Sequence, residues 1–315
     1  MTNHKDHTPS RAVVSIVTPT FNRAHLLRRT WASICQQSVQ SFEWIVVDDG
    51  STDDTCAVIQ SFNDIRIKYI AQTNQGVNAA RNRGEKELHT PYVIFLDSDD
   101  EFNGPDAMAL MVREMTDAPQ DVGVVYFGVI EAGSGQRKYK LDKDRLLATY
   151  EDHVCEQQFS GEFFPIYRRD VLKLAPWPTD VSGLESLRHW EIARHQMSLF
   201  IDQPTRIYHT SSGDNLSSAT SAIGRAPSMA KATRTLIALH RATWASKCPN
   251  QIGRYAFFLA MYEALSGTGA PARHLMQSLR WGDRNIRRKS LTLLATLCLP
   301  LSWRRHLFIW RTSNA

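Results

Sequence analysis

The chain has 315 residues, of which 43% are hydrophobic and 22% charged, and its formal net charge is +5. This length can bury a large core in one or two domains, and the composition excludes a disordered, collagen-like or disulfide-scaffold protein. The five cysteines form no C-x-x-C pair and their number is odd, which favours a reducing compartment and argues against a cysteine metal site.

The N-terminal residues 1–11 are polar and contain Pro9, so they lack the apolar run of a signal peptide, and we expect a short disordered lead. The β-branched run Val13–Thr18 then predicts a buried strand that is stopped by Pro19. An amphipathic helix should follow, with Asn22 as its N-cap.

Strands and helices alternate through the first two thirds of the chain. Further strands are predicted at Phe42–Val47, Ile65–Ile70, Tyr92–Leu96, Val122–Ile130 and Phe163–Tyr167. Further helices are predicted from Ser51 or Thr52, at Gln75–Leu88 and at Leu184–Phe200. This alternation predicts an α/β domain with a mainly parallel sheet and flanking helices.

Three polar clusters follow predicted strands, at residues 19–22, 48–51 and 97–100. In open α/β sheets, ligands bind beyond the carboxyl ends of the strands, so these clusters predict one binding site. The turn Asp97-Ser98-Asp99 presents two carboxylates together, and hard oxygen ligands of this kind suit Mg²⁺ or Mn²⁺. A turn that merely caps a helix is the alternative reading of the same residues.

Two further groups of polar residues are candidates for the same site. Asp48 and Asp49 end the second strand, where one carboxylate can accept from a uracil-type N–H or a ribose hydroxyl and the other can cap the backbone turn. Asn78 and Arg81 share one face of a predicted helix, and a guanidinium there suits either a diphosphate or the acidic clusters.

Four segments, VSIVTPTFNR, EWIVVDDGSTDDT, NQGVNAARNRG and YVIFLDSDD, resemble in order and spacing the N-terminal half of family-2 glycosyltransferases with the GT-A fold. The resemblance covers about Val13–Asp100 and continues weakly to about Leu216. It implies a Rossmann-like GT-A catalytic domain over residues 12–215 and an inverting transfer from a nucleoside-diphosphate sugar, with a UDP-sugar favoured.

The resemblance also implies roles for individual residues. Thr18, Pro19, Phe21 and Asn22 would line the nucleoside pocket, and Asp48, with Asp49, would contact the base. Asp97 and Ser98 would lie near the ribose and metal, and Asp99 would ligate Mn²⁺ or Mg²⁺ at the diphosphate. Arg81 and the cation would stabilise the charge that develops on the leaving diphosphate.

Inversion by direct displacement needs a base for the acceptor hydroxyl, and the family resemblance implies a Glu-Asp pair at a helix start. The corresponding stretch is Gly183-Leu184-Glu185-Ser186, so Ser186 replaces the Asp and Glu185 is the candidate base. The open alternatives are a first-turn Glu favoured by the helix dipole, a base elsewhere such as Asp180, and a weak enzyme. His209 is a candidate metal or diphosphate ligand, although a lone His is more often structural.

Residues 216–315 carry 15 Lys and Arg but only Glu263 and Asp283 as acids, whereas the first 215 carry 22 basic and 30 acidic side chains. We expect a helical, basic C-terminal region. The apolar run Leu291–Leu301 is too short to span a bilayer, but it suits a helix at the cytoplasmic face of a membrane, where a lipid-linked acceptor is found. A core helix is the alternative, and no nucleic-acid motif appears.

The sequence therefore predicts an enzyme of surface polysaccharide synthesis with a glycan or lipid-linked acceptor. Two alternative functions remain open. A catalytically inactive sugar-nucleotide-binding module is suggested by Ser186. A nucleotidyltransferase also uses paired carboxylates and a metal, but it would show a Gly-rich basic loop after the first strand, which TPTFNR does not resemble.

Overall fold

The structure is a computed structural model, and it describes residues 12–155, 158–181, 185–209 and 219–313. The chain divides into two compact units. Unit 1 comprises residues 1–150, 158–177 and 191–210, and unit 2 comprises residues 151–157, 178–190 and 211–315. The expected lead at 1–11 and the expected domain boundary at 215/216 lie outside the described residues.

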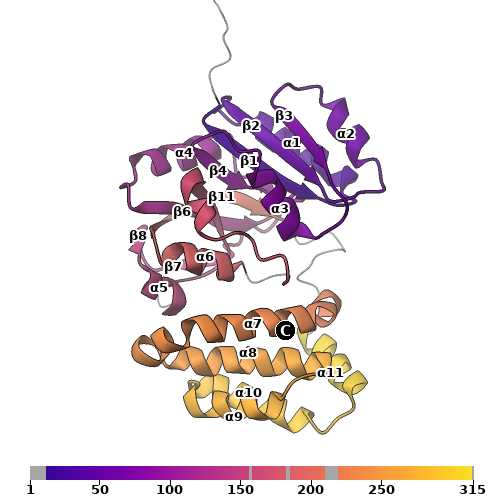
Figure 1. Ribbon diagram of the computed structural model, residues 1–315, viewed down its shortest axis with the longest axis vertical. Coiled ribbons are helices and arrows are strands. Elements are labelled where there is room, and N and C mark those ends of the chain that lie inside the picture. The colour runs from indigo at the N-terminus through magenta and orange to yellow at the C-terminus, as the bar shows by residue number, and fades with distance from the viewer. Residues whose placement is uncertain (1–11, 156–157, 182–184, 210–218, 314–315) are drawn as a thin grey trace, which may run out of the picture. The chain divides into compact units, whose positions relative to one another are not determined.

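Unit 1 contains a nine-stranded mixed sheet in the order β3-β2-β1-β4-β10-β6-β11-β5, with β8 paired to β11. Its strands are β1 (Val14–Thr20), β2 (Phe42–Asp48), β3 (Ile67–Ala71), β4 (Tyr92–Phe95), β5 (Glu101–Phe102), β6 (Val122–Glu131), β8 (Arg145–Ala148), β10 (Phe163–Arg168) and β11 (Met197–Tyr208). β7 (Tyr139–Leu141) and β9 (Phe159–Gly161) form a separate pair. The strands β1 to β4 are mutually parallel, as the sequence predicts, and Figure 1 shows β2, β1 and β4 lying in succession.

Helices pack on both faces of this sheet, and alternate side chains of each strand point to opposite faces. One face holds Ile16 and Trp44 and packs against α1 (Ala24–Cys35), α2 (Thr55–Ser61) and α4 (Ala107–Asp117). The other holds Val17 and Ile45 and packs against α3 (Val77–Glu85). The continuous apolar runs of β1 and β2 thus reflect burial on both faces, which is typical of parallel sheets.

Two local predictions near β1 are wrong, and each has a physical reason. Pro19 does not stop the strand, which continues to Thr20. Pro19 faces the same side as Val17, and pairing with β4 ends at Val17, so no ladder hydrogen bond is lost. Asn22 does not cap α1: its φ is +53°, and the N-cap is Arg23 without a side-chain hydrogen bond.

The predicted helix at Leu184–Phe200 is also wrong over its second half. The helix α6 spans only Ser186–Ala193, and the chain then enters β11 at Met197. Residues 182–184, where the predicted helix was to begin, lie outside the described part. Leu199 and Ile201 pack on one face of the sheet and Phe200 on the other, so β11 is buried on both sides and lacks the alternation that marks a half-exposed strand.

The described part of unit 2 is mainly helical, as the sequence predicts for the C-terminal third. They include α7 (Ala219–Lys247), α8 (Asn250–Ser266), α9 (Pro271–Trp281), α10 (Arg284–Thr296) and α11 (Leu301–Ser313). The helices α7 and α9 both pack against α8. Among the described residues, none of the helices has the length and apolar character needed to cross a membrane.

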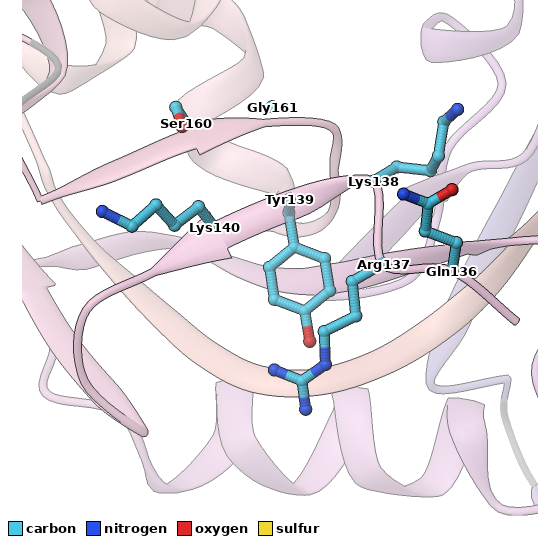
Figure 2. A pocket seen from close by; sticks show the side chains of 7 residues that line it. All are labelled: Gln136, Arg137, Lys138, Tyr139, Lys140, Ser160 and Gly161. Atoms are coloured by element: carbon cyan, nitrogen blue, oxygen red, sulfur yellow. The ribbon is translucent and has the colours of Figure 1, made fainter.

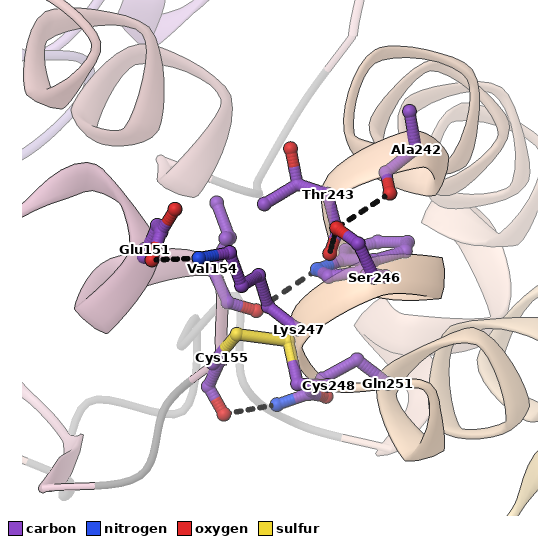
Figure 3. Close-up of a disulfide and its surroundings, with 10 residues drawn as sticks. Glu151, Val154, Cys155, Ala242, Thr243, Ser246, Lys247, Cys248 and Gln251 are labelled. Carbon is purple, nitrogen blue, oxygen red and sulfur yellow. Dashed lines mark hydrogen bonds and ion pairs between the residues drawn. A yellow bond between two sulfur atoms is a disulfide. The ribbon is translucent and has the colours of Figure 1, made fainter.

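A disulfide between Cys155 and Cys248 lies within unit 2, a pairing that the sequence analysis does not predict (Figure 3). It joins α5 (Tyr150–Cys155) to the segment between α7 and α8, across 93 residues of sequence. Beside it, the Trp244 indole donates to the Val154 carbonyl at 2.9 Å. A cross-link closing a loop of this length typically stabilises a fold by roughly 2–4 kcal/mol. Sequence spacing could not reveal it, because pairing depends on the tertiary fold.

Candidate active site

The candidate site lies where β1, β2 and β4 end. β1 is the central strand of the three, and Thr20 pairs in register with Asp48 at their carboxyl ends. β4 ends at Phe95, beside Val17, and leads into Asp97. The strand order changes direction at β1, with β2 on one side and β4 on the other, which is the position where open α/β sheets bind ligands.

The loops after β1 and β2 are tied together by hydrogen bonds. The side-chain oxygen of Asn22 accepts from the backbone N–H of Thr52 at 2.8 Å, and the Asn22 N–H donates to the Ser51 hydroxyl at 2.8 Å. Asp53 accepts from the backbone N–H of Ala24 at 3.0 Å, which satisfies a donor at the start of α1. Asn22, expected to line the nucleoside pocket, therefore lies at this edge and fixes the shape of both loops.

The two acids at the end of β2 are both buried, with 3% of each residue exposed. Asp49 accepts from the backbone N–H groups of Gln75 at 2.9 Å and Gly76 at 2.7 Å, so it positions the start of α3. Asp48 accepts from the Tyr69 hydroxyl at 2.5 Å and from the Ser51 N–H at 2.8 Å. Burial, together with the hydrogen bond to Asp48, raises the pKa of Tyr69, so this phenol stays a donor.

Each carboxylate of the Asp97-Ser98-Asp99 turn is paired with an arginine from a different helix region. Arg81 of α3 donates to Asp97 at 2.9 Å, and Arg23 before α1 donates to Asp99 at 2.8 Å. Ser98 is 6% exposed, and its carbonyl accepts from Thr30 at 2.9 Å. The sequence-predicted residues Arg81, Asp97 and Asp99 thus belong to one network.

The Arg81 side chain contacts Asp97, Asn78 and Trp177. It lies 3.5 Å from the Asn78 side-chain oxygen, its guanidinium stands 4.5 Å from the centre of the Trp177 ring, and its side chain is only 7% exposed. Stacking and ion pairing fix the orientation of the guanidinium fork, as bidentate recognition of phosphate requires.

The two acids that follow the turn in the sequence, Asp100 and Glu101, also pair with basic side chains. Arg206 of β11 approaches the 1%-exposed Asp100 at 3.3 Å, and the His209 ring contacts Glu101 at 2.6 Å. Burial raises the pKa of Asp100 to about 7, Arg206 opposes the shift, and Asp97 and Asp99 add to it. His209 is thus engaged by Glu101, and its predicted role as a metal or diphosphate ligand stays a prediction.

Thr18, Pro19 and Phe21 occupy different environments. Thr18 is fully buried, and its hydroxyl accepts from the Trp44 indole at 2.8 Å, so the Thr18 side chain is turned into the core. Pro19 is buried in β1, whereas Phe21 is 44% exposed just beyond the strand. Of the three, Phe21 is the side chain available for stacking on a nucleobase.

The chemistry of the turn fits a divalent cation. Asp97 and Asp99 each use one oxygen for an arginine, and the other oxygen makes no hydrogen bond to a described residue. Two carboxylate oxygens match the partial set that Mg²⁺ takes from proteins when substrate phosphates complete the shell. Within the described residues, no group of three or more His, Cys, Asp or Glu side chains is arranged to hold a metal ion.

Glu185 belongs to unit 2, is exposed, and directly precedes α6. Its backbone carbonyl accepts from the N–H groups of Arg188 at 3.0 Å and His189 at 3.1 Å, as expected for the first residue of a helix. The rival base Asp180 pairs with Lys231 at 2.7 Å. The Lys231 hydrogen bond and charge lower the pKa of Asp180, which makes Asp180 a poorer base.

Several residues of the site could not be assigned from the sequence. Arg23 lies inside the TPTFNR motif, but the sequence does not indicate that it pairs with Asp99. Arg206 and Trp177 are far along the chain from Asp100 and Arg81, the residues that they contact. Tyr69 sits on β3, where its alternation predicted only a strand position. Only the three-dimensional fold brings these side chains to the acidic turn.

Comparison with known proteins identifies the family of this chain. The family model described as "Glycosyl transferase family 2" matches residues 15–174. The chain belongs to this family, which makes it a glycosyltransferase.

Two named proteins are similar to part of this chain. The chain is 31% identical over 205 residues to the GalNAc(5)-diNAcBac-PP-undecaprenol beta-1,3-glucosyltransferase of Campylobacter jejuni, covering 62% of this chain and 64% of that protein. It is 34% identical over 143 residues to the glycosyltransferase GlyA of Streptococcus pneumoniae, covering 45% of this chain and 20% of that protein. The matches thus span less than two thirds of each relative.

Solved structures confirm the GT-A-like fold. S. aureus TarS 1–349 in complex with UDP-GlcNAc aligns with a TM-score of 0.59 at 16% identity, covering 90% of this chain and 92% of that one. The mannosyltransferase PcManGT of Pyrobaculum calidifontis, in complex with GDP-Man and Mn²⁺, aligns with a TM-score of 0.55 at 19% identity, covering 96% and 84%.

Proposed function

We propose that this chain is a metal-dependent inverting glycosyltransferase that moves a sugar from a nucleoside-diphosphate sugar to a glycan or lipid-linked acceptor in surface polysaccharide synthesis. A UDP-sugar is the favoured donor. The observation that carries the proposal is the network in which Arg23, Arg81, Asp97 and Asp99 join the ends of β1 and β4 to α3. Such a network offers both cations for a diphosphate and carboxylates for a metal.

The nucleoside part of the donor has two candidate partners. Phe21, whose side chain is exposed, stacks on the base in this proposal, and Asp48 accepts from a base N–H or ribose hydroxyl. Asp49, whose carboxylate holds the turn before α3, supports the site rather than contacting the nucleotide. Ser98 and Asn78 are both buried and orient their neighbours from within the same network.

Asp97 and Asp99 are the residues that would hold Mn²⁺ or Mg²⁺. When bound, such an ion neutralises the charge that develops on the leaving nucleoside diphosphate. Arg81 and Arg23 supply further positive charge from fixed positions, so little reorganisation is needed during the reaction. Glu185 removes the proton of the acceptor hydroxyl. The low pKa of Asp180 supports Glu185 over that rival.

The basic unit 2 is proposed to associate with the cytoplasmic face of the cell membrane. Leu291 on α10 and Trp303 on α11 are 57% and 64% exposed, and both helices are rich in arginine. Apolar side chains next to cations are typical of helices that lie among anionic headgroups. The C. jejuni relative carries PP-undecaprenol in its name, which supports a lipid-linked acceptor for this chain too.

The test is a titration of the purified chain with nucleoside diphosphates, followed by hydrolysis assays on a panel of nucleotide sugars. We expect UDP to bind more tightly with Mn²⁺ than with EDTA, and at least one donor to be turned over with inversion. Metal-dependent binding without turnover of any donor, with or without acceptor lipids, would instead identify an inactive sugar-nucleotide-binding module. Release of diphosphate from a nucleoside triphosphate would identify a nucleotidyltransferase.

A further inference from the structure

A basic hollow of about 350 Å³ lies within unit 2, between α7, α8 and α9. Its polar wall contains Arg234 and Arg241 from α7 and Arg273 and His274 from α9. Ile237 and Leu259 supply an apolar part of the lining. Because α7 and α9 both pack against α8, the hollow is built from three helices that support one another.

The charges of this hollow are unbalanced. Glu263, which is 1% exposed, pairs with Arg234 at 2.8 Å and also accepts from the Ala270 N–H at 3.0 Å. Arg241 and Arg273 are exposed and make no ion pair with any residue that the structure describes. The buried Glu263 carboxylate therefore pairs with only one of the three arginines that line the hollow, which leaves a net positive charge even with His274 neutral.

A second hollow, on unit 1, is also lined by basic side chains, but each of them is paired with an acid (Figure 2). It also measures about 350 Å³, and Figure 2 shows the side chains of Arg137, Lys138 and Lys140 along β7 and the segment before it. Each of these cations has an acid: Arg137 pairs with Asp202 at 2.7 Å, Lys138 with Glu131 at 3.4 Å and Lys140 with Asp142 at 3.2 Å. The hollow on unit 1 therefore carries no comparable excess.

We propose that the hollow between α7, α8 and α9 binds a phosphate or diphosphate group. Guanidinium groups present paired donors that match phosphate oxygens, and Arg241 and Arg273 line the hollow from two different helices, α7 and α9. The Glu263 carboxylate, fixed by the Ala270 N–H, orients Arg234 beside them. Ile237 and Leu259 would contact the organic group that bears the phosphate. The inference is independent of the proposed transfer reaction, because none of the residues that line the hollow belongs to the proposed donor site or is the proposed base.

The same chemistry has two sources, a free anion and a lipid headgroup, and the test separates them. The full chain is titrated calorimetrically with inorganic pyrophosphate in EDTA, as wild type and as the double variant Arg241→Gln/Arg273→Gln. The matched control is Lys247→Gln/Arg280→Gln, which removes two exposed cations from α7 and α9 outside the hollow. Circular dichroism checks that all variants are folded.

We expect the hollow variant to bind pyrophosphate at least tenfold more weakly than both wild type and control. In a second arm, the proteins are sedimented with phosphatidylcholine vesicles with or without a polyprenyl diphosphate. A lipid source predicts that diphosphate-bearing vesicles pellet wild type and control but not the hollow variant. Pyrophosphate binding without this vesicle effect supports a free anion. Equal behaviour of hollow variant and wild type in both arms would overturn the proposal.

Discussion

Replacing Asp99 by alanine is expected to lower kcat by about 10³-fold, because the variant loses a metal ligand at the diphosphate and with it stabilisation of the leaving group. The fold should survive. The Asp99–Arg23 pair is partly exposed, at 21% and 18%, and such pairs contribute at most about 1 kcal/mol. Initial rates at saturating donor and Mn²⁺, alongside thermal unfolding, measure both effects.

Asp121→Ala is the matched control for this experiment. Asp121 is an exposed carboxylate that precedes β6, away from the turn after β4, and its removal should change neither rate nor stability. If Asp99→Ala retained wild-type turnover under these conditions, Asp99 would not serve the reaction and the metal assignment would be lost.

The second large effect is expected for Glu185→Gln, which removes the proposed base while keeping the size of the side chain. General bases typically contribute about 10²- to 10⁴-fold, so kcat for transfer should fall within that range. The dissociation constant for UDP with Mn²⁺ should be unchanged, because Glu185 acts on the acceptor rather than the donor. Calorimetry for binding and steady-state kinetics for transfer separate the two quantities.

Two variants make this test specific. Glu191→Gln changes a partly exposed acid on the same helix, α6, and should leave kcat near wild type. Asp180→Asn removes the rival carboxylate and should also have little effect. A normal rate for Glu185→Gln combined with a slow Asp180→Asn would transfer the role of base to Asp180, despite its pairing with Lys231.

The parallel half of the sheet could be predicted from the sequence because short apolar runs ending in polar clusters carry a strong signal. The runs VVSIVT, FEWIVV and YVIFL correspond to β1, β2 and β4, and their polar ends meet as expected. The last residue of β1 could not be predicted from the sequence, because a proline is tolerated in a strand where its missing N–H would face no partner strand, as at Pro19.

Features that depend on contacts between distant parts of the chain could not be predicted from the sequence. β11 is buried on both faces and resembles a helix in hydropathy, so Met197–Phe200 was misassigned. The arginine partners of the acidic turn and the Cys155–Cys248 bond require contacts that no local pattern encodes. Thr18 matches a motif position but turns its side chain toward Trp44, so a motif places the backbone more reliably than it places a contact.

The most direct test of the central claim is a crystal structure of the chain with UDP and Mn²⁺. The account predicts the cation on carboxylate oxygens of Asp97 and Asp99, the diphosphate beside Arg81 and Arg23, and the uracil between Phe21 and Asp48. Electron density for the nucleotide at any other edge of the sheet, or a cation bound without either acid of the turn, would contradict it.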